Sequence, residues 1–131
     1  MPTVQIEVRQ QYSQADEEQL LDSVFQCVKN AFQLPDYDRN IRLVVHEAHR
    51  FQYMTHLTQP EYFTLIGIDC FAGRSLETKR KLYQQIIESL GKLGIPPDHI
   101  LIHLRESPLE NWGIRGGQAA CDVNLGFNVE I

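Results

Sequence analysis

The sequence predicts an α+β fold in which two β-α-β units form one four-stranded sheet with both helices on one face, followed by a C-terminal strand. Short runs of alternating apolar and polar residues are typical of strands, and stretches with apolar residues at helical spacing lie between these runs. The whole pattern occurs twice, with a spacing of 62 positions from Ser13 to Ser75. A repeat of this kind indicates two copies of one supersecondary unit within a single fold.

The first unit begins with an alternating strand that carries Val4, Ile6 and Val8 on one side. Ser13 opens the predicted helix, because its hydroxyl can accept a hydrogen bond from a free N–H of the first turn. Apolar residues then follow one helix face: Leu20, Leu21, Val24, Phe25 and Val28. A second strand covers residues 41–46, and the long crossover between the strands predicts that they are parallel.

The second unit repeats this order with Ile66, Ile68 and Cys70 in its first strand and Ser75 at the start of its helix. The apolar helix positions also return: Leu82, Tyr83, Ile86, Ile87 and Leu90. Gly94 suits the left-handed end of this helix, and a last strand follows over residues 100–104. The prediction is one domain over residues 1–131, with repeats at about 2–46 and 64–104.

Two segments lie outside the repeats. Residues 47–62 are predicted to form a loop or a short extra strand. Residues 111–131 are predicted to form a Gly-rich turn and a strand, with apolar residues alternating along it: Val123, Leu125, Phe127, Val129 and Ile131. The helices cover only one face of a sheet whose strands look apolar on both, which predicts oligomerisation through the free face, with the C-terminal strand near a subunit boundary.

Composition excludes several classes of protein. A net charge of −5 argues against nucleic-acid binding, which usually requires a basic surface. No apolar run is long enough for a membrane span and no signal region is evident, so a cytoplasmic location is expected. Cys27, Cys70 and Cys121 show no metal-ligand spacing, so neither a zinc site nor a disulfide framework is predicted.

Pro2 is the most informative single residue. Removal of Met1 would leave a proline at the N-terminus, with a free secondary amine held rigidly by its ring. Such an amine can act as a general base when its pKa lies near neutrality. The alternative is a proline that only precedes a strand.

Pro2, the duplicated unit and the chain length together resemble the tautomerase superfamily. Three segments strengthen the resemblance: residues 71–75 (FAGRS), 93–98 (LGIPPD) and 111–117 (NWGIRGG). Within the superfamily, the chain is most similar to the malonate semialdehyde decarboxylase-like branch. This resemblance implies a homotrimer that needs no metal or organic cofactor.

The resemblance also implies roles for individual residues. Pro2 matches the catalytic proline, Asp38 the catalytic aspartate, Arg74 a carboxylate-binding arginine and Trp112 an aromatic wall of the pocket. Ala72 stands where the decarboxylase branch has a second arginine.

From the residues themselves, Arg115 could supply the charge that Ala72 lacks, and Ile114 could help to exclude water from the pocket. Asp38 could instead cap a turn, and Arg115 could form a salt bridge across a subunit interface. We expect Pro2, Arg74 and Trp112 to line one cavity at the start of the first strand.

The leading hypothesis is a cofactor-independent tautomerase that acts on a small 2-oxo acid or enol carboxylate, with Pro2 as general base. One alternative is a decarboxylase or hydratase acting on a small 3-oxo acid such as malonate semialdehyde, which the missing arginine at position 72 disfavours. The other alternative is a non-catalytic trimeric binding protein of the same fold.

Overall fold

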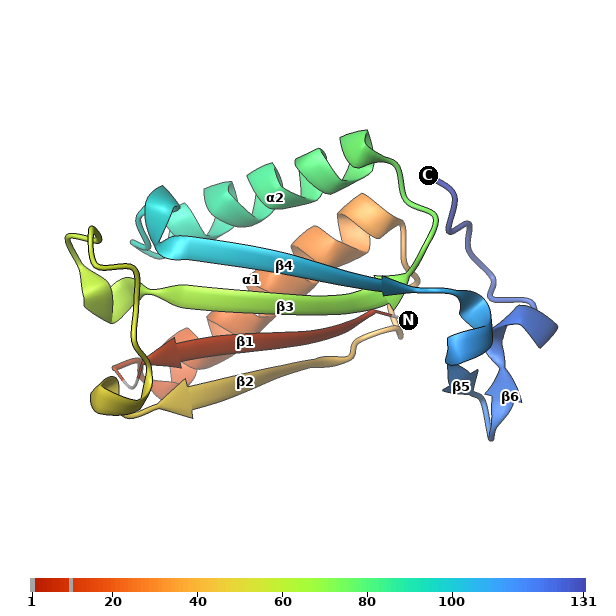
Figure 1. Cartoon of the computed structure of the whole chain (residues 1–131), viewed down its shortest axis with the longest axis horizontal. Coiled ribbons are helices and arrows are strands. Elements are labelled where there is room, and N and C mark those ends of the chain that lie inside the picture. Colours follow the sequence, from red (N-terminus) through yellow and green to blue (C-terminus); the bar gives the residue numbers. More distant parts are fainter. Residues whose placement is uncertain (1, 10) are drawn as a thin grey trace.

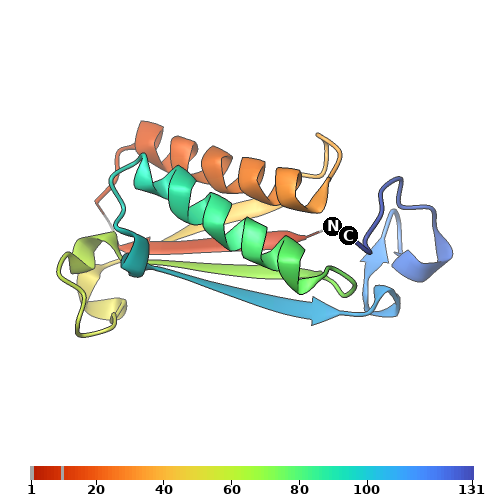
Figure 2. The same cartoon turned by 90° about the horizontal axis from the view of Figure 1, so that it is seen from above.

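The computed structural model describes residues 2–9 and 11–131 and contains one four-stranded sheet with two helices (Figure 1). In chain order its main elements are β1 (Thr3–Arg9), α1 (Gln14–Phe32), β2 (Ile41–His46), β3 (Thr64–Phe71), α2 (Leu76–Gly91) and β4 (Ile100–Ser107). The strand order is β2-β1-β3-β4, and both helices lie on one face of the sheet (Figure 2). Each β-α-β unit contains a parallel pair, while β1 and β3 pair antiparallel at the centre. The predicted architecture of the sheet and helices is confirmed.

The antiparallel pairing of β1 with β3 relates the two units by a pseudo-two-fold axis. Val4 lies opposite Ile68, and Ile6 lies opposite Ile66. The equivalent of Val4 in the second unit is Ile66, and that of Ile6 is Ile68. Exchanging equivalent residues therefore turns the pair Val4–Ile68 into the pair Ile66–Ile6, which is also observed. Both ends of the sheet therefore contain equivalent structural positions, contributed by opposite halves of the chain.

The main core lies between the sheet and the two helices. Along β1 the side chains are alternately buried, with Ile6 fully enclosed. The helices contribute their predicted apolar faces, including Leu20 and Val24 from α1 and Leu82 and Ile86 from α2. Burial of each such side chain contributes about 1.5–3 kcal/mol. Neither helix in the described part of the chain has the length and apolar character needed to cross a membrane.

The two serines cap the helices as predicted. The Ser13 Oγ accepts a hydrogen bond from the Asp16 N–H at 3.2 Å, and the Ser75 Oγ accepts one from the Thr78 N–H at 3.2 Å. Each cap satisfies one free N–H group of a first helical turn. The caps thereby define where the loops before α1 and α2 end.

The free face of the sheet is more polar than the sequence pattern indicated. Arg105 donates two hydrogen bonds to the carboxylate of Asp69, at 2.6 and 3.1 Å. On the neighbouring strands, the His46 Nε2 and the Glu7 Oε1 lie 3.0 Å apart. Leu101 on this face is 46% exposed. The prediction that both faces are apolar is therefore wrong, because charged residues alternate with the buried ones on β1 and β4.

Residues 47–62 form a loop with two short 3-10 turns, Ala48–Arg50 and Pro60–Tyr62, and contain no strand. Phe51 and Leu57 are buried there with Phe63, and Leu65 of β3 packs against this cluster. Of the two predicted alternatives, the loop is the one observed. It has a small apolar core of its own at the end of the sheet opposite Pro2.

The predicted C-terminal strand over residues 123–131 is wrong. Residues 123–131 form an irregular tail without helix or strand, and the short strands of this region lie before it: β5 (Gly113–Ile114) and β6 (Gln118–Ala119), followed by a 3-10 turn at Ala120–Asp122. The Asn124 Oδ1 accepts a hydrogen bond from the Gly126 N–H, and the Asn128 Oδ1 accepts one from the Glu130 N–H, both at 3.0 Å. Asparagine side chains that bond the backbone in this way favour turns over strand ladders.

Candidate functional site

The candidate site lies at the end of the sheet where β1 begins and β3 ends. Pro2 is buried and directly precedes β1. The Val4 N–H donates to the carbonyl of Asn40 at 2.8 Å, which brings the loop before β2 to this end. The loop from β3 to α2 carries Arg74, and the segment after β4 follows at the same end of the molecule (Figures 1 and 2).

Arg74 is a buried cation, with only 5% of its surface exposed. Its Nη1 donates to the carbonyl of Phe71 at 3.1 Å, and its guanidinium carbon lies 4.2 Å from the centre of the Phe32 ring. The Nε and Nη2 atoms are also buried, and neither has a hydrogen-bond partner among the described residues. These two N–H groups lie on one edge of the guanidinium, an arrangement that suits a carboxylate.

Burial lowers the pKa of Arg74, and the nearby Cys70, Glu106 and Asp38 oppose this shift. A guanidinium nevertheless stays protonated in a protein at ordinary pH. The site therefore contains a desolvated positive charge with two donors that have no partner among the described residues, and such a charge favours an anionic partner.

Asp38 is 5% exposed, and its charge supports the protonated form of Arg74. The Asp38 Oδ1 accepts a hydrogen bond from the Asn40 Nδ2 at 2.9 Å, and the Asp38 backbone N–H donates to the carbonyl of Pro35 at 3.1 Å. Asp38 thus belongs to a turn, as one interpretation expected, and also lies within electrostatic range of Arg74.

A cavity of about 130 Å³ brings Asp38 together with Ile114 and Arg115. The other lining residues are Tyr37, Leu125 and Phe127. Arg115 donates to the carbonyls of Asn124 at 2.6 Å and Leu125 at 3.2 Å. Its guanidinium therefore anchors the C-terminal tail next to the cavity.

Trp112 packs edge-on against Phe71, with ring centres 5.0 Å apart and an interplanar angle of 82°. Its Nε1 donates to the Ser107 Oγ at 2.8 Å, which fixes the indole orientation. Phe71 thus contacts Trp112 through its ring and Arg74 through its carbonyl. That Pro2, Arg74 and Trp112 line one cavity stays a prediction.

Sequence reasoning missed Phe32 beside Arg74, and it missed Leu125 and Phe127 as cavity residues. Phe32 fits the apolar spacing of its helix, so nothing in the sequence separates it from an ordinary core residue. For the tail, Asn124 two positions before Gly126 was a usable turn signal. Among the described residues, no group of three histidine, cysteine or acidic side chains is arranged to hold a metal ion.

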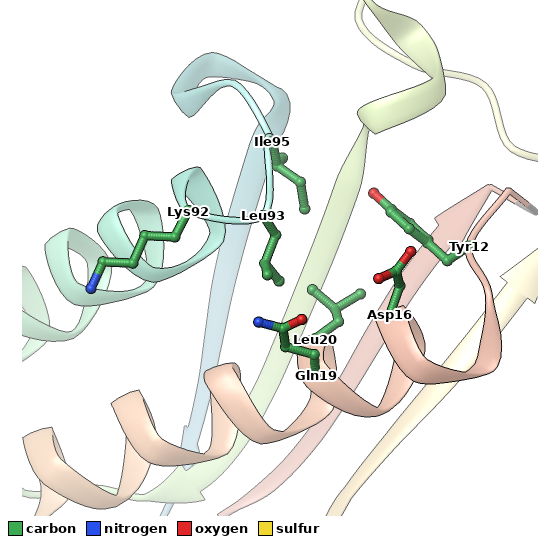
Figure 3. A pocket seen from close by; sticks show the side chains of 7 residues that line it. All are labelled: Tyr12, Asp16, Gln19, Leu20, Lys92, Leu93 and Ile95. Carbon is green, nitrogen blue, oxygen red and sulfur yellow. The ribbon is translucent and has the colours of Figure 1, made fainter.

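A second hollow of about 290 Å³ lies at the opposite end of the molecule, between the start of α1 and the loop after α2 (Figure 3). Tyr12 lines it and occupies the position before Ser13 that Arg74 occupies before Ser75. Lys92 also lines it, but its amine points away from Tyr12 and Asp16. Although this hollow is larger, it lacks a buried cation, so we do not assign the chemistry to it.

The Tyr12 hydroxyl is buried without a hydrogen-bond partner among the described residues. Replacing it in Tyr12→Phe should leave the free energy of unfolding at pH 7 unchanged or raise it by up to about 1 kcal/mol, because an unsatisfied polar group is removed. Urea unfolding measures this change. A loss of more than about 1 kcal/mol would show that the hydroxyl has a favourable partner.

The same variant has a pH signature. Burial, followed by the effect of Tyr62, raises the pKa of Tyr12 from 10.0 to about 12. The pKa of Tyr12 is higher in the folded chain than in the unfolded chain, so the unfolded chain releases the phenol proton at lower pH. The contribution of this group to the free energy of unfolding is therefore fully present below pH 10.0 and is lost as the pH rises towards about 12. Tyr12→Phe should therefore lose less stability than the wild type over this range.

Comparison with known proteins identifies the family. A family model described as tautomerase enzyme matches residues 38–115. An FG41 malonate semialdehyde decarboxylase inhibited by 3-bromopropiolate superposes with a TM-score of 0.80 at 22% identity, covering 89% of this chain and 92% of that one.

Two further structures have the same fold. The protein Pt0534 inactivated by 2-oxo-3-pentynoate superposes with a TM-score of 0.82 at 21% identity, covering 92% of this chain and 97% of that one. A wild-type fused 4-OT, F6, solved as an asymmetric trimer, gives a TM-score of 0.81 at 24% identity with the same coverages, 92% and 97%.

Proposed function

Since this chain belongs to the tautomerase enzyme family, we propose that it is a cofactor-independent enzyme that tautomerises a small 2-oxo acid or enol carboxylate. The observation that carries this proposal is the burial of Arg74 with its Nε and Nη2 unpartnered among the described residues. A buried cation with two open donors on one edge needs an anionic partner of matching shape. A carboxylate of the substrate provides that partner.

Pro2 acts as the general base in this proposal, after Met1 has been removed. The neutral amine takes the proton from the enol oxygen, and the resulting pyrrolidinium delivers a proton to the neighbouring carbon. The substrate becomes a ketone and the amine returns to its neutral form. Burial at the start of β1 supports this role, because a base on a rigid strand is held at a defined position.

The other site residues orient the substrate and exclude water. Asp38 bonds a hydroxyl or a water near the reacting atoms, and Arg115 adds positive charge beside the cavity that it lines with Asp38. Ile114 and Trp112 form an apolar wall, which strengthens the polar interactions by excluding solvent. Pt0534 is inactivated by 2-oxo-3-pentynoate, which supports a 2-oxo acid as the substrate class.

The test is the ketonisation of enol phenylpyruvate, followed by its ultraviolet absorbance, with protein whose intact mass shows that it begins at Pro2. We expect a rate that depends on enzyme concentration. A rate indistinguishable from that of buffer, over several enol carboxylates, would contradict the proposed function. Carbon dioxide release from malonate semialdehyde measures the decarboxylase alternative, which Ala72 disfavours.

We also propose that the chain assembles as a homotrimer through the free face of its sheet. Leu101 is 46% exposed there, and the F6 fused 4-OT, which has the same fold, was solved as a trimer. Light scattering at micromolar concentration should give three times the chain mass of 15.2 kDa. A monomer at that concentration would rule out this assembly.

A further inference from the structure

We infer that Phe32 is the positioning residue for Arg74: its ring holds the guanidinium so that the Nε–Nη2 edge remains unpaired and available to the substrate carboxylate. The inference rests on the proposed function, because it concerns the same anion-binding group.

The geometry of the contact is that of a cation–π interaction. The guanidinium carbon of Arg74 lies 4.2 Å from the Phe32 ring centre, within the distance of about 6 Å over which such contacts attract. The Phe32 side chain is completely buried. The attraction is strongest in such desolvated surroundings, where water does not compete for the cation.

The chain holds Phe32 rigidly at the end of α1. Phe32 is the last residue of the helix, and Gln33 follows in the left-handed conformation with φ 53°. The Leu34 N–H then donates back to the carbonyl of Lys29 at 3.0 Å, which closes the helix end. A ring fixed in this way can define the position of a flexible arginine side chain.

The ring stabilises a buried cation without occupying its hydrogen-bond donors. The charge of Glu106 raises the pKa of Arg74, against the lowering caused by burial. A carboxylate bonded directly to Arg74 would occupy the N–H groups that the substrate needs. Glu106 instead accepts a hydrogen bond from the Lys79 Nζ at 2.6 Å. The aromatic face therefore attracts Arg74 while its Nε and Nη2 remain without a partner among the described residues.

The pseudo-symmetric end of the molecule provides an internal comparison. Tyr12 replaces Arg74 there, and Leu93 stands two positions before Ile95 as Phe32 stands two positions before Leu34. The two helix ends also close in the same way, because the Leu34 N–H and the Ile95 N–H each donate to the carbonyl five positions earlier, that of Lys29 at 3.0 Å and that of Leu90 at 3.2 Å. Where the cation is absent, the aromatic ring is absent too.

The test compares Phe32→Leu with the matched variant Phe25→Leu. Phe25 lies on the same helix, is buried, and has the guanidinium carbon of Arg39 4.0 Å from its ring centre. Arg39 is also bonded to Asp22 at 2.7 Å. Both substitutions therefore remove a buried ring and one arginine contact, but only Phe32→Leu affects Arg74.

Two readouts separate positioning from general destabilisation. In the ketonisation assay, Phe32→Leu should raise KM about threefold to tenfold with kcat within about twofold, because the carboxylate must then order Arg74 on binding. In NMR, the Arg74 Nε–H signal should shift when the ring is removed. When the Phe32→Leu protein is titrated with benzoylformate, a 2-oxo acid that cannot enolise, the Arg74 signal should give a Kd that is weaker than that of the wild type by the same factor as the rise in KM. Phe25→Leu should leave the KM and the Kd for benzoylformate unchanged. Phe32→Tyr keeps the aromatic ring, so its KM and Kd should equal those of the wild type.

Each outcome bears on a single proposal. If the wild type binds no benzoylformate at Arg74, the proposed function fails. If the wild type binds it and Phe32→Leu binds it equally well, with an unmoved Arg74 signal, the positioning inference fails. Equal increases in KM for Phe32→Leu and Phe25→Leu would also overturn it, because the effect would then be one of helix stability. Should Phe32→Leu not fold, the Phe32→Met variant takes its place with the same expected result, since methionine has a similar volume and no aromatic face.

Discussion

Protein that retains Met1 should ketonise enol phenylpyruvate at least about 10²-fold more slowly than protein that begins at Pro2, since general acid–base catalysis contributes about 10²–10⁴-fold. The reason is that the Pro2 nitrogen can accept a proton only when it is a free amine. In the retained form the Pro2 nitrogen belongs to a peptide bond, whose electron pair is delocalised into the carbonyl and accepts no proton. In the processed form it is a free secondary amine.

The comparison needs two preparations of the same chain, distinguished by intact mass. For the processed form, the rate should rise with pH as the Pro2 amine loses its proton. Pro2→Ala, also processed, keeps a primary amine and should retain part of the activity, because the ring and the basicity of the nitrogen both change. Equal rates for the retained and processed forms would exclude Pro2 as the base, whatever else the site does.

Arg74→Ala should lower kcat/KM for the same substrate by about 10²-fold, mainly through a raised KM, because two charge-assisted hydrogen bonds are lost at about 1.5 kcal/mol or more each. A fall in kcat would add to this if the arginine charge also acts on the Pro2 amine. Arg74→Lys keeps the positive charge but loses the planar, forked guanidinium, so its kcat/KM should lie between those of the wild type and Arg74→Ala.

Arg39→Ala is the matched control for Arg74→Ala. Arg39 also stacks on a phenylalanine of α1, with its guanidinium carbon 4.0 Å from the ring centre of Phe25. Although it follows Asp38 in the chain, Arg39 does not line the cavity that Asp38 shares with Arg115, and it pairs with the exposed Asp22. Its removal should leave KM unchanged, since exposed ion pairs contribute little. An Arg74→Ala protein with the KM of the wild type would show that the substrate carboxylate binds elsewhere.

Periodicity and capping were sufficient to predict the sheet and both helices. Ser13 and Ser75 start the helices, and the spacing between their apolar residues is regular, so local signals agree with the final packing. The strand predicted for the C-terminal tail was wrong because its alternating apolar residues pack against the rest of the chain without pairing as a strand. Leu125 and Phe127 of that tail contact the cluster around Phe71 instead of extending a strand.

The candidate site was predicted less completely than the fold. Sequence and resemblance together predicted Asp38 and Arg74 as site residues, and the structure buries both of them; their roles stay predictions. The contact between Phe32 and Arg74 joins residues far apart in the chain, and it depends on how the end of α1 packs against the loop between β3 and α2. Local patterns contain no information about such a contact, because it arises only when the two elements pack together.

The pseudo-two-fold axis has a consequence for how many working sites such a chain can possess. Thr64 is the equivalent of Pro2 at the far end, but its nitrogen belongs to the middle of the polypeptide and can never be a terminal amine. Likewise, His99 stands four positions after Ile95, as Asp38 does after Leu34, and it is 1% exposed and accepts the Gln59 N–H at 3.0 Å. Joining two repeats in one chain therefore leaves one terminal amine for two repeats, so the chemistry proposed for Pro2 has an equivalent amine at one end of the sheet only.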